Sequence, residues 1–179
     1  SIYGMYASGG WSNKREDNVL DGGSYYYGVY ETADNKFISI GSIEGKFHDV
    51  LLEITGLTDA STIDRNDRST WEEKKQRMEQ LVRLKTRDEW DELMLGTDVC
   101  YAPVLNFEEA PKHPHNLARQ SFVEVEGVMQ PAPAPKFSRT PGTVQMPPPA
   151  PGQHTSEILS DWGFDAHEIE KLKDVGAVS

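Results

Sequence analysis

Residues 25–45 read YYYGVYETADNKFISIGSIEG, and this stretch decides the fold. Residues 25–32 and 36–42 are rich in Tyr, Val and Ile, which favour an extended backbone. The short polar connection between them, residues 33–35, is typical of a hairpin turn. The stretch therefore predicts two antiparallel strands, the second of which ends near Gly41 and leads into a helix.

Three helices are predicted downstream, because apolar residues recur there at three- and four-residue spacing. Ser42 is expected to cap the first of them. The second opens with Ser69 three residues before Glu72, which is the pattern of a capping box. Thr86 and Glu89 repeat this pattern at the start of the third. The buried faces are expected to carry Phe47, Val50, Leu51, Ile54, Leu57, Trp71, Met78, Leu81, Val82, Trp90, Leu93 and Met94.

The second half of the chain shows weaker order. Residues 99–105 form a short apolar strand, in which Cys100 is expected to be buried, and residues 121–129 read as a hairpin. The segment 131–151 carries 8 of the 11 prolines and should run extended, because proline cannot continue a helix or donate to a sheet. Short helical segments are expected near residues 156–162 and 165–173.

These patterns predict an α/β organisation in three parts. Residues 1–17 read as the end of an upstream helix followed by a linker. Residues 18–130 should form a small α+β domain with a short, largely antiparallel sheet and packed helices. Residues 131–179 should form a proline-rich extended strap with a helical cap, and its exposed aromatic residues need an apolar surface to lie against.

Composition excludes several classes of function. The 18 Lys and Arg residues against 29 Asp and Glu give a formal net charge of −11, which argues against nucleic-acid binding and against a coenzyme A phosphate site lying wholly in this chain. No run approaches the ~18 apolar residues that cross a bilayer, and no secretory signal is present, so a cytoplasmic location is expected. The single cysteine and the spacing of the five histidines predict no metal site.

Few motifs in the chain carry chemistry. The glycine pattern of dinucleotide-binding loops, the phosphate-binding loop and the nucleophile elbow of hydrolases are all missing from the sequence. Glu44 stands out because it lies where a strand passes into a helix, and a helix N-terminus favours an ionised carboxylate. A catalytic role and an ordinary place in the first helical turn are both compatible with this position. Cys100 has apolar neighbours, which favours a packing role over that of a nucleophile.

Five segments in the correct order resemble the second half of the α-methylacyl-CoA racemases, which belong to the CoA-transferase family III (CaiB/BaiF) group. The resemblance covers nearly the whole chain, with Gly28 and Gly45 where the family often has Asp and usually has Pro. The segments are NVLDGG at 18–23, VYETAD at 29–34, IGSIE at 40–44, TDVCYAPV at 97–104 and PAPAPKFSRT at 131–140.

The resemblance implies an enzyme of lipid metabolism that inverts a 2-methyl branch next to a thioester without metal or organic cofactor; the substrate itself carries coenzyme A. It implies an interlocked homodimer in which each subunit has a large Rossmann-like domain and a small α/β domain. A His and an Asp of the large domain would carry the proton transfers, with Glu44 assisting the His. Ile43 and Tyr27 become candidate substrate-binding residues. This chain would supply the small domain and the strap, and is expected to be inactive without its N-terminal half.

Two alternatives remain open. A family III CoA-transferase would move coenzyme A between carboxylic acids through an aspartyl thioester, but many such enzymes carry a longer glycine-rich loop near Gly22, where this chain continues directly into Tyr25. A non-catalytic interaction module would instead use its apolar strap to bind a partner chain.

Overall fold

The computed structural model of the chain describes residues 1–57 and 64–179. The chain divides into two compact units, Ser1–Asn106 and Phe107–Ser179. The sequence pattern predicts a domain boundary at residue 130, after the second hairpin. That hairpin falls in the second unit here, because its two strands pair with each other and not with the first sheet.

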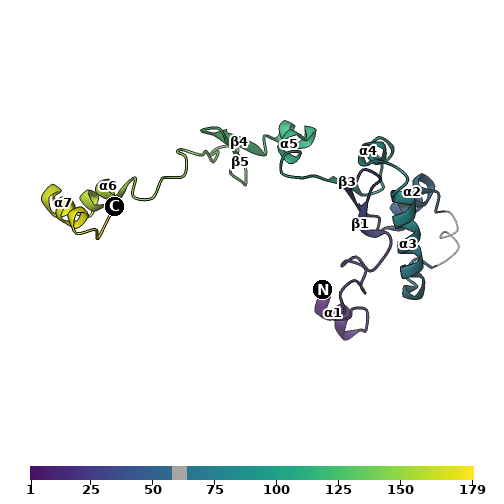
Figure 1. Cartoon of the computed structure of the whole chain (residues 1–179). Helices are drawn as coiled ribbons and strands as arrows, with labels where there is room; N and C mark the ends of the chain where they lie inside the picture. The colour runs from purple at the N-terminus through teal and green to yellow at the C-terminus, as the bar shows by residue number, and fades with distance from the viewer. Residues whose placement is uncertain (58–63) are drawn as a thin grey trace. The chain divides into compact units, whose positions relative to one another are not determined.

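The first unit is built on a three-stranded antiparallel sheet (Figure 1). Strand β1 spans Tyr27–Glu31, β2 spans Phe37–Gly41 and β3 spans Tyr101–Val104, with β2 in the centre. The turn between β1 and β2 contains Asn35 at φ 57°, a left-handed conformation that asparagine tolerates. The predicted antiparallel pair is therefore confirmed, and β3 extends it.

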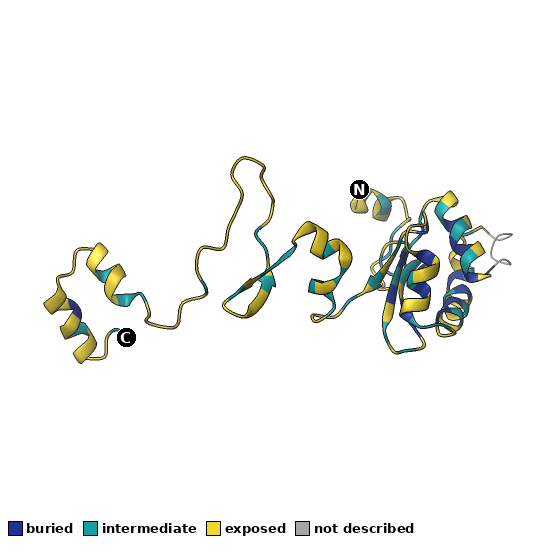
Figure 2. Ribbon diagram, turned by 90° about the horizontal axis from the view of Figure 1, so that it is seen from above, coloured by how far each residue is buried: buried dark blue, intermediate teal, exposed yellow. Residues whose placement is uncertain are grey.

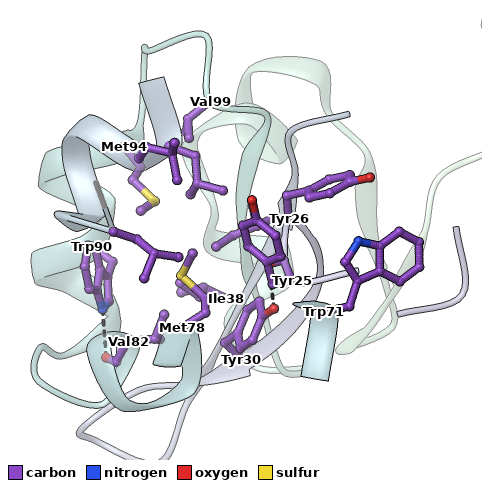
Figure 3. Packing of buried hydrophobic residues seen from close by; sticks show 14 residues of the cluster. Tyr25, Tyr26, Tyr30, Ile38, Trp71, Met78, Val82, Trp90, Met94 and Val99 are labelled. Carbon is purple, nitrogen blue, oxygen red and sulfur yellow. Dashed lines mark hydrogen bonds between the residues drawn. The ribbon is translucent and has the colours of Figure 1, made fainter. Parts of the chain in front are cut away.

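Helices pack against one face of this sheet. They are α2 (Gly45–Thr55), α3 (Trp71–Val82) and α4 (Arg87–Met94), and the short α1 (Ile2–Ala7) precedes them in the chain. Buried residues concentrate in this part of the molecule (Figure 2). Figure 3 shows their packing, in which Trp90 donates from its indole to the carbonyl of Val82 at 2.9 Å. The core comprises Tyr25, Tyr26, Tyr30, Ile38, Ile40, Leu51, Leu52, Leu57, Trp71, Met78, Val82, Trp90, Met94 and Val99.

Two of the predicted helix starts form differently. Ser42 does not cap α2: the N-cap position is Glu44, and the Ser42 hydroxyl donates elsewhere. The box expected at Ser69 is also missing, because a 3-10 turn, η2 (Arg68–Thr70), precedes α3 and is capped by Asp67. The capping box at the start of α4 forms as predicted.

The helix faces agree with the apolar periodicity in most positions. Leu93 is an exception, since it is 44% exposed although its spacing predicted burial. Helix α2 ends at Gly56, whose φ of 74° places it in the left-handed region where glycine stops helices. The predicted end of this helix is confirmed.

The second unit is more exposed than the first (Figure 2). The hairpin predicted for residues 121–129 is confirmed, and residues 132–151 contain no helix or strand, as their prolines predicted. No helix within the described residues is long and apolar enough to cross a membrane. The elements of this unit are η3 (Ala110–Lys112), α5 (Pro114–Arg119), β4 (Phe122–Val125), β5 (Val128–Pro131), α6 (Thr155–Asp161) and α7 (Ala166–Asp174).

Candidate active site

Glu44 lies at the junction between the central strand and α2, where the sequence placed it. Strand β2 ends at Gly41 and the helix begins at Gly45. The backbone of Glu44 is extended, and its carbonyl accepts the first bond of the helix from the His48 N–H at 2.9 Å. The carboxylate itself is exposed and makes no side-chain capping bond. It is therefore accessible to a group from outside the first unit.

A groove of about 710 Å³ crosses the sheet next to this junction. The β1–β2–β3 register sets Val29, Ser39 and Ala102 side by side across its floor. Tyr27 also lines it, and a Cβ added at Gly41 would lie 3.6 Å from the Tyr27 ring. The lining residues are Arg15, Glu16, Leu20, Asp21, Gly22, Tyr27, Gly28, Val29, Ser39, Ile40, Gly41, Lys75, Glu79, Cys100, Tyr101 and Ala102.

The structure thus places the three candidate residues differently. Tyr27 lines the groove, whereas Ile43 and Glu44 follow Gly41 in the chain and are not among its lining residues. Ile43 is partly buried, and its N–H donates to the carbonyl of Gly41 at 2.9 Å. Their roles stay predictions, but all three belong to the same end of the sheet.

The loop NVLDGG forms one wall of the groove. Asn18, which is 1% exposed, donates from its amide to the Asp21 carboxylate at 2.7 Å and accepts from the Ser12 N–H at 2.8 Å. Partial burial acts to raise the pKa of Asp21, but the bonds from Asn18 and from backbone N–H groups outweigh it and lower that pKa. Gly23 is required here, because a Cβ would lie 2.7 Å from the Asn18 backbone nitrogen and oxygen.

Lys75 of α3 ties this loop to the helix. Its ammonium donates to the carbonyl of Gly22 at 3.0 Å and to the Glu16 carboxylate at 3.1 Å. Two of the groove's charged residues are thereby paired with each other. The groove therefore combines apolar and aromatic lining residues with a charged margin.

His48 forms a buried network that no motif in the sequence indicates. Its Nε2 lies 2.7 Å from the Tyr25 hydroxyl. Tyr30 donates to the Tyr25 carbonyl at 2.6 Å (Figure 3). The pKa of His48 is lowered, first by burial and then by the positive charge of Arg65. The buried ring packs within the first turn of α2, four residues after Glu44 in the chain. His48 lies three residues before Leu51, and this spacing places both side chains on the buried face of α2.

Cys100 corrects one expectation. It is exposed and lines the groove, with φ 56°, while its neighbour Val99 is fully buried. The left-handed turn directs only one of the two side chains inward, so the prediction of a buried strand residue was wrong. Partial desolvation of the thiol, followed by the negative charges of Glu44 and Asp98, raises the pKa of Cys100. The thiol is therefore protonated at neutral pH and is a poor nucleophile.

The described residues offer little further acid–base chemistry around Glu44. They contain no cluster of three or more His, Cys, Asp or Glu side chains that would hold a metal ion. The nearest histidine along α2, His48, is buried against Tyr25. What the first unit presents is the exposed side chain of Glu44 at a strand-to-helix junction, next to a groove that has charged residues at its margin.

Comparisons with known proteins place this arrangement in a family. The model of CoA-transferase family III matches residues 2–155. The α-methylacyl-CoA racemases of Mus musculus and Homo sapiens are 40% and 38% identical to the chain over 164 residues, covering 90% of the chain and 43% of each relative. The chain belongs to CoA-transferase family III, and it spans less than half the length of these relatives.

Other matches are more distant. A protein named acyl-CoA transferase from Fusarium pseudograminearum is 34% identical over 52% of the chain and 22% of its own length. The crystal structure of a CAIB/BAIF family protein from Brucella suis superimposes with a TM-score of 0.65 over 89% of the chain and 43% of that protein, at 18% identity. Rv3272 from Mycobacterium tuberculosis gives 0.58 over 73% of the chain and 37% of its own, at 19% identity. These structures support the fold, and the sequence resemblance to the racemases is confirmed.

Proposed function

We propose that this chain is the small-domain part of an enzyme that epimerises 2-methylacyl-CoA thioesters. The observation that carries the proposal is the breadth of the racemase similarity: 40% and 38% identity extend over 90% of the chain. The match to the protein named acyl-CoA transferase covers 52%. A similarity that includes the Glu44 junction, the groove strands and the C-terminal strap favours the racemase reaction over coenzyme A transfer.

The proposed reaction exchanges one proton. A base removes the proton from the carbon next to the thioester carbonyl, and the electron pair moves onto the carbonyl oxygen to give an enolate. An acid on the opposite face then returns a proton to the same carbon and inverts the methyl branch. No electron is gained or lost overall, so the reaction as proposed needs no redox cofactor, and we propose that acid–base side chains carry it without a metal or an organic cofactor.

Glu44 is proposed to assist a histidine supplied by an N-terminal large domain. A carboxylate that accepts from one imidazole nitrogen orients the ring and stabilises its protonated form, while the other nitrogen exchanges the substrate proton. The exposure of Glu44 and its position on a rigid strand-to-helix junction support this role. Tyr27 and Ile43 are proposed to contact the acyl part of the substrate. We also propose that the full-length protein forms an interlocked homodimer, lies in the cytoplasm and acts in lipid metabolism.

The reaction is tested with the full-length protein that contains this chain. A single 2-methylacyl-CoA epimer is incubated in deuterated water, and deuterium at the α-carbon and loss of optical purity are followed together. Racemase activity gives both at comparable rates. A family III CoA-transferase, the second candidate, instead moves coenzyme A to an added carboxylic acid and leaves the α-carbon unlabelled. An interaction module does neither.

The role of Glu44 is tested by Glu44→Gln in the same protein. The amide is nearly isosteric but carries no charge to stabilise an imidazolium, so turnover should fall by about 10²–10⁴-fold. The free energy of unfolding should change by less than about 0.5 kcal/mol, since the side chain is exposed. Glu53→Gln, an exposed position on the same helix, is the matched control. Unchanged turnover in Glu44→Gln would remove the assignment.

A further inference from the structure

The hydroxyl of Ser42 makes a buried connection across the sheet end. Ser42 is fully buried, and its Oγ donates to the carbonyl of Val99 at 2.5 Å. The two residues are 57 positions apart, and Val99 precedes the edge strand β3. Because this hydroxyl does not cap α2, its hydrogen bond serves the turn that carries Ile43 and Glu44 instead.

Backbone hydrogen bonds converge on the same turn. The N–H of Ser42 donates to the Tyr26 carbonyl at 2.9 Å, which connects the turn to the start of β1. The N–H of Gly41 donates to the Cys100 carbonyl at 2.9 Å, which connects it to β3. Ser42 is therefore held from both neighbouring strands, and its hydroxyl is the one side-chain donor that the described residues contribute to this junction.

Glu44 lies two residues further on and depends on this turn for its position. Its side chain is exposed and makes no capping bond, so no hydrogen bond of that kind fixes the carboxylate. Its location is set by the backbone on either side, namely the turn at Ser42 and the first turn of α2. A shift of the turn would be transmitted directly to the carboxylate.

We propose that Ser42 is a positioning residue for Glu44: its hydrogen bond to Val99 holds the strand-to-helix turn so that the carboxylate meets the histidine that it assists. The inference rests on the proposed function. Removing the hydroxyl leaves the Val99 carbonyl buried without this donor, and the turn then moves to recover a partner or water. A displacement of about 1 Å at a catalytic constellation can lower the rate by about 100-fold.

The test compares Ser42→Ala with a matched loss of a buried hydroxyl. Thr55 lies at the far end of the same helix, is also buried, and donates to the Leu51 carbonyl at 2.7 Å. In the full-length enzyme, Ser42→Ala should lower kcat by about 10- to 100-fold with little change in KM, whereas Thr55→Val should leave both near their original values. Ser42→Cys keeps a donor at this position, although the thiol is larger and donates more weakly, and should also lower kcat.

A double-mutant cycle separates positioning from a purely structural role. If Ser42 acts through Glu44, then Ser42→Ala should cause no further loss of kcat in the Glu44→Gln background. Amide hydrogen exchange of the peptide covering residues 41–45 should be faster in Ser42→Ala than in Thr55→Val, because only the first variant loosens the turn.

The outcomes distinguish this inference from the proposed function. An equal loss of kcat from Ser42→Ala with Glu44 and with Gln at that position overturns the positioning role. The positioning role is also overturned if kcat is unchanged in both Ser42→Ala and Ser42→Cys while Glu44→Gln is impaired. In that case the proposed function stands. If Glu44→Gln itself is fully active, the catalytic assignment and the inference fall together.

Discussion

Replacing Asn18 with alanine should destabilise the first unit strongly, because this side chain holds the loop that forms the groove wall. Its amide donates to the Asp21 carboxylate at 2.7 Å and to the Ser12 carbonyl at 3.2 Å, and its oxygen accepts from the Ser12 N–H at 2.8 Å. A fourth contact, to the Lys14 carbonyl, is long at 3.4 Å and is neglected.

The magnitude follows from the chemistry of these bonds. A neutral hydrogen bond contributes about 1 kcal/mol and one to a charged group about 1.5–3 kcal/mol. Ser12 and Asp21 are only partly buried, so water recovers some of the loss. We expect Asn18→Ala to lower the free energy of unfolding by about 2–3 kcal/mol. With an m-value of about 2 kcal/mol per molar, the urea midpoint falls by about 1–1.5 M.

Urea unfolding of the 179-residue chain, followed by tryptophan fluorescence, measures this change. Trp71 and Trp90 are buried in the first unit and report on its unfolding. Asn13→Ala is the control, since Asn13 lies in the same loop region but is exposed, and its midpoint should not move. A shift of less than about 0.3 M for Asn18→Ala, equal to the control, would refute the hydrogen-bond argument.

Three further predictions concern a helix cap, a buried histidine and the activity of the isolated chain. Thr86→Ala breaks a formed capping box and should cost about 1 kcal/mol in thermal or urea unfolding, whereas Ser69→Ala should cost less than about 0.5 kcal/mol because no box forms there; equal costs would contradict this. The pKa of His48 lies below its ordinary value of 6.5, so the unfolded chain takes up this proton first as the pH falls. The contribution of neutral His48 to the free energy of unfolding is complete above about pH 6.5 and decreases as the pH falls toward the lower pKa of the folded histidine. His48→Gln should therefore flatten this part of the pH profile of the free energy of unfolding, measured by urea denaturation. Finally, the 179-residue chain alone should not exchange the α-proton of a 2-methylacyl-CoA with deuterated water, and deuterium uptake detected by mass spectrometry would overturn that expectation.

Local structure was predictable because its causes lie within a few residues. The alternation and β-branched content of residues 36–42 predicted β2, and the polar turn before it predicted antiparallel pairing. Thr86 with Glu89 predicted the start of α4, and the prolines after residue 131 predicted a segment without helix or strand. The position of Glu44 at a strand-to-helix junction followed from the same signals, while the family resemblance singled it out for a role.

Contacts between distant segments were decided only by the tertiary structure. The hydroxyl of Ser42 looked like a helix cap, but a carbonyl 57 residues away is its acceptor. Cys100 looked buried from its apolar neighbours, yet a left-handed turn directs it outward. His48 meets Tyr25 across 23 residues of chain. Sequence periodicity reports which face of an element is apolar, but a polar side chain takes whichever partner packing brings within about 3 Å, and that partner is set by how the strands and helices assemble.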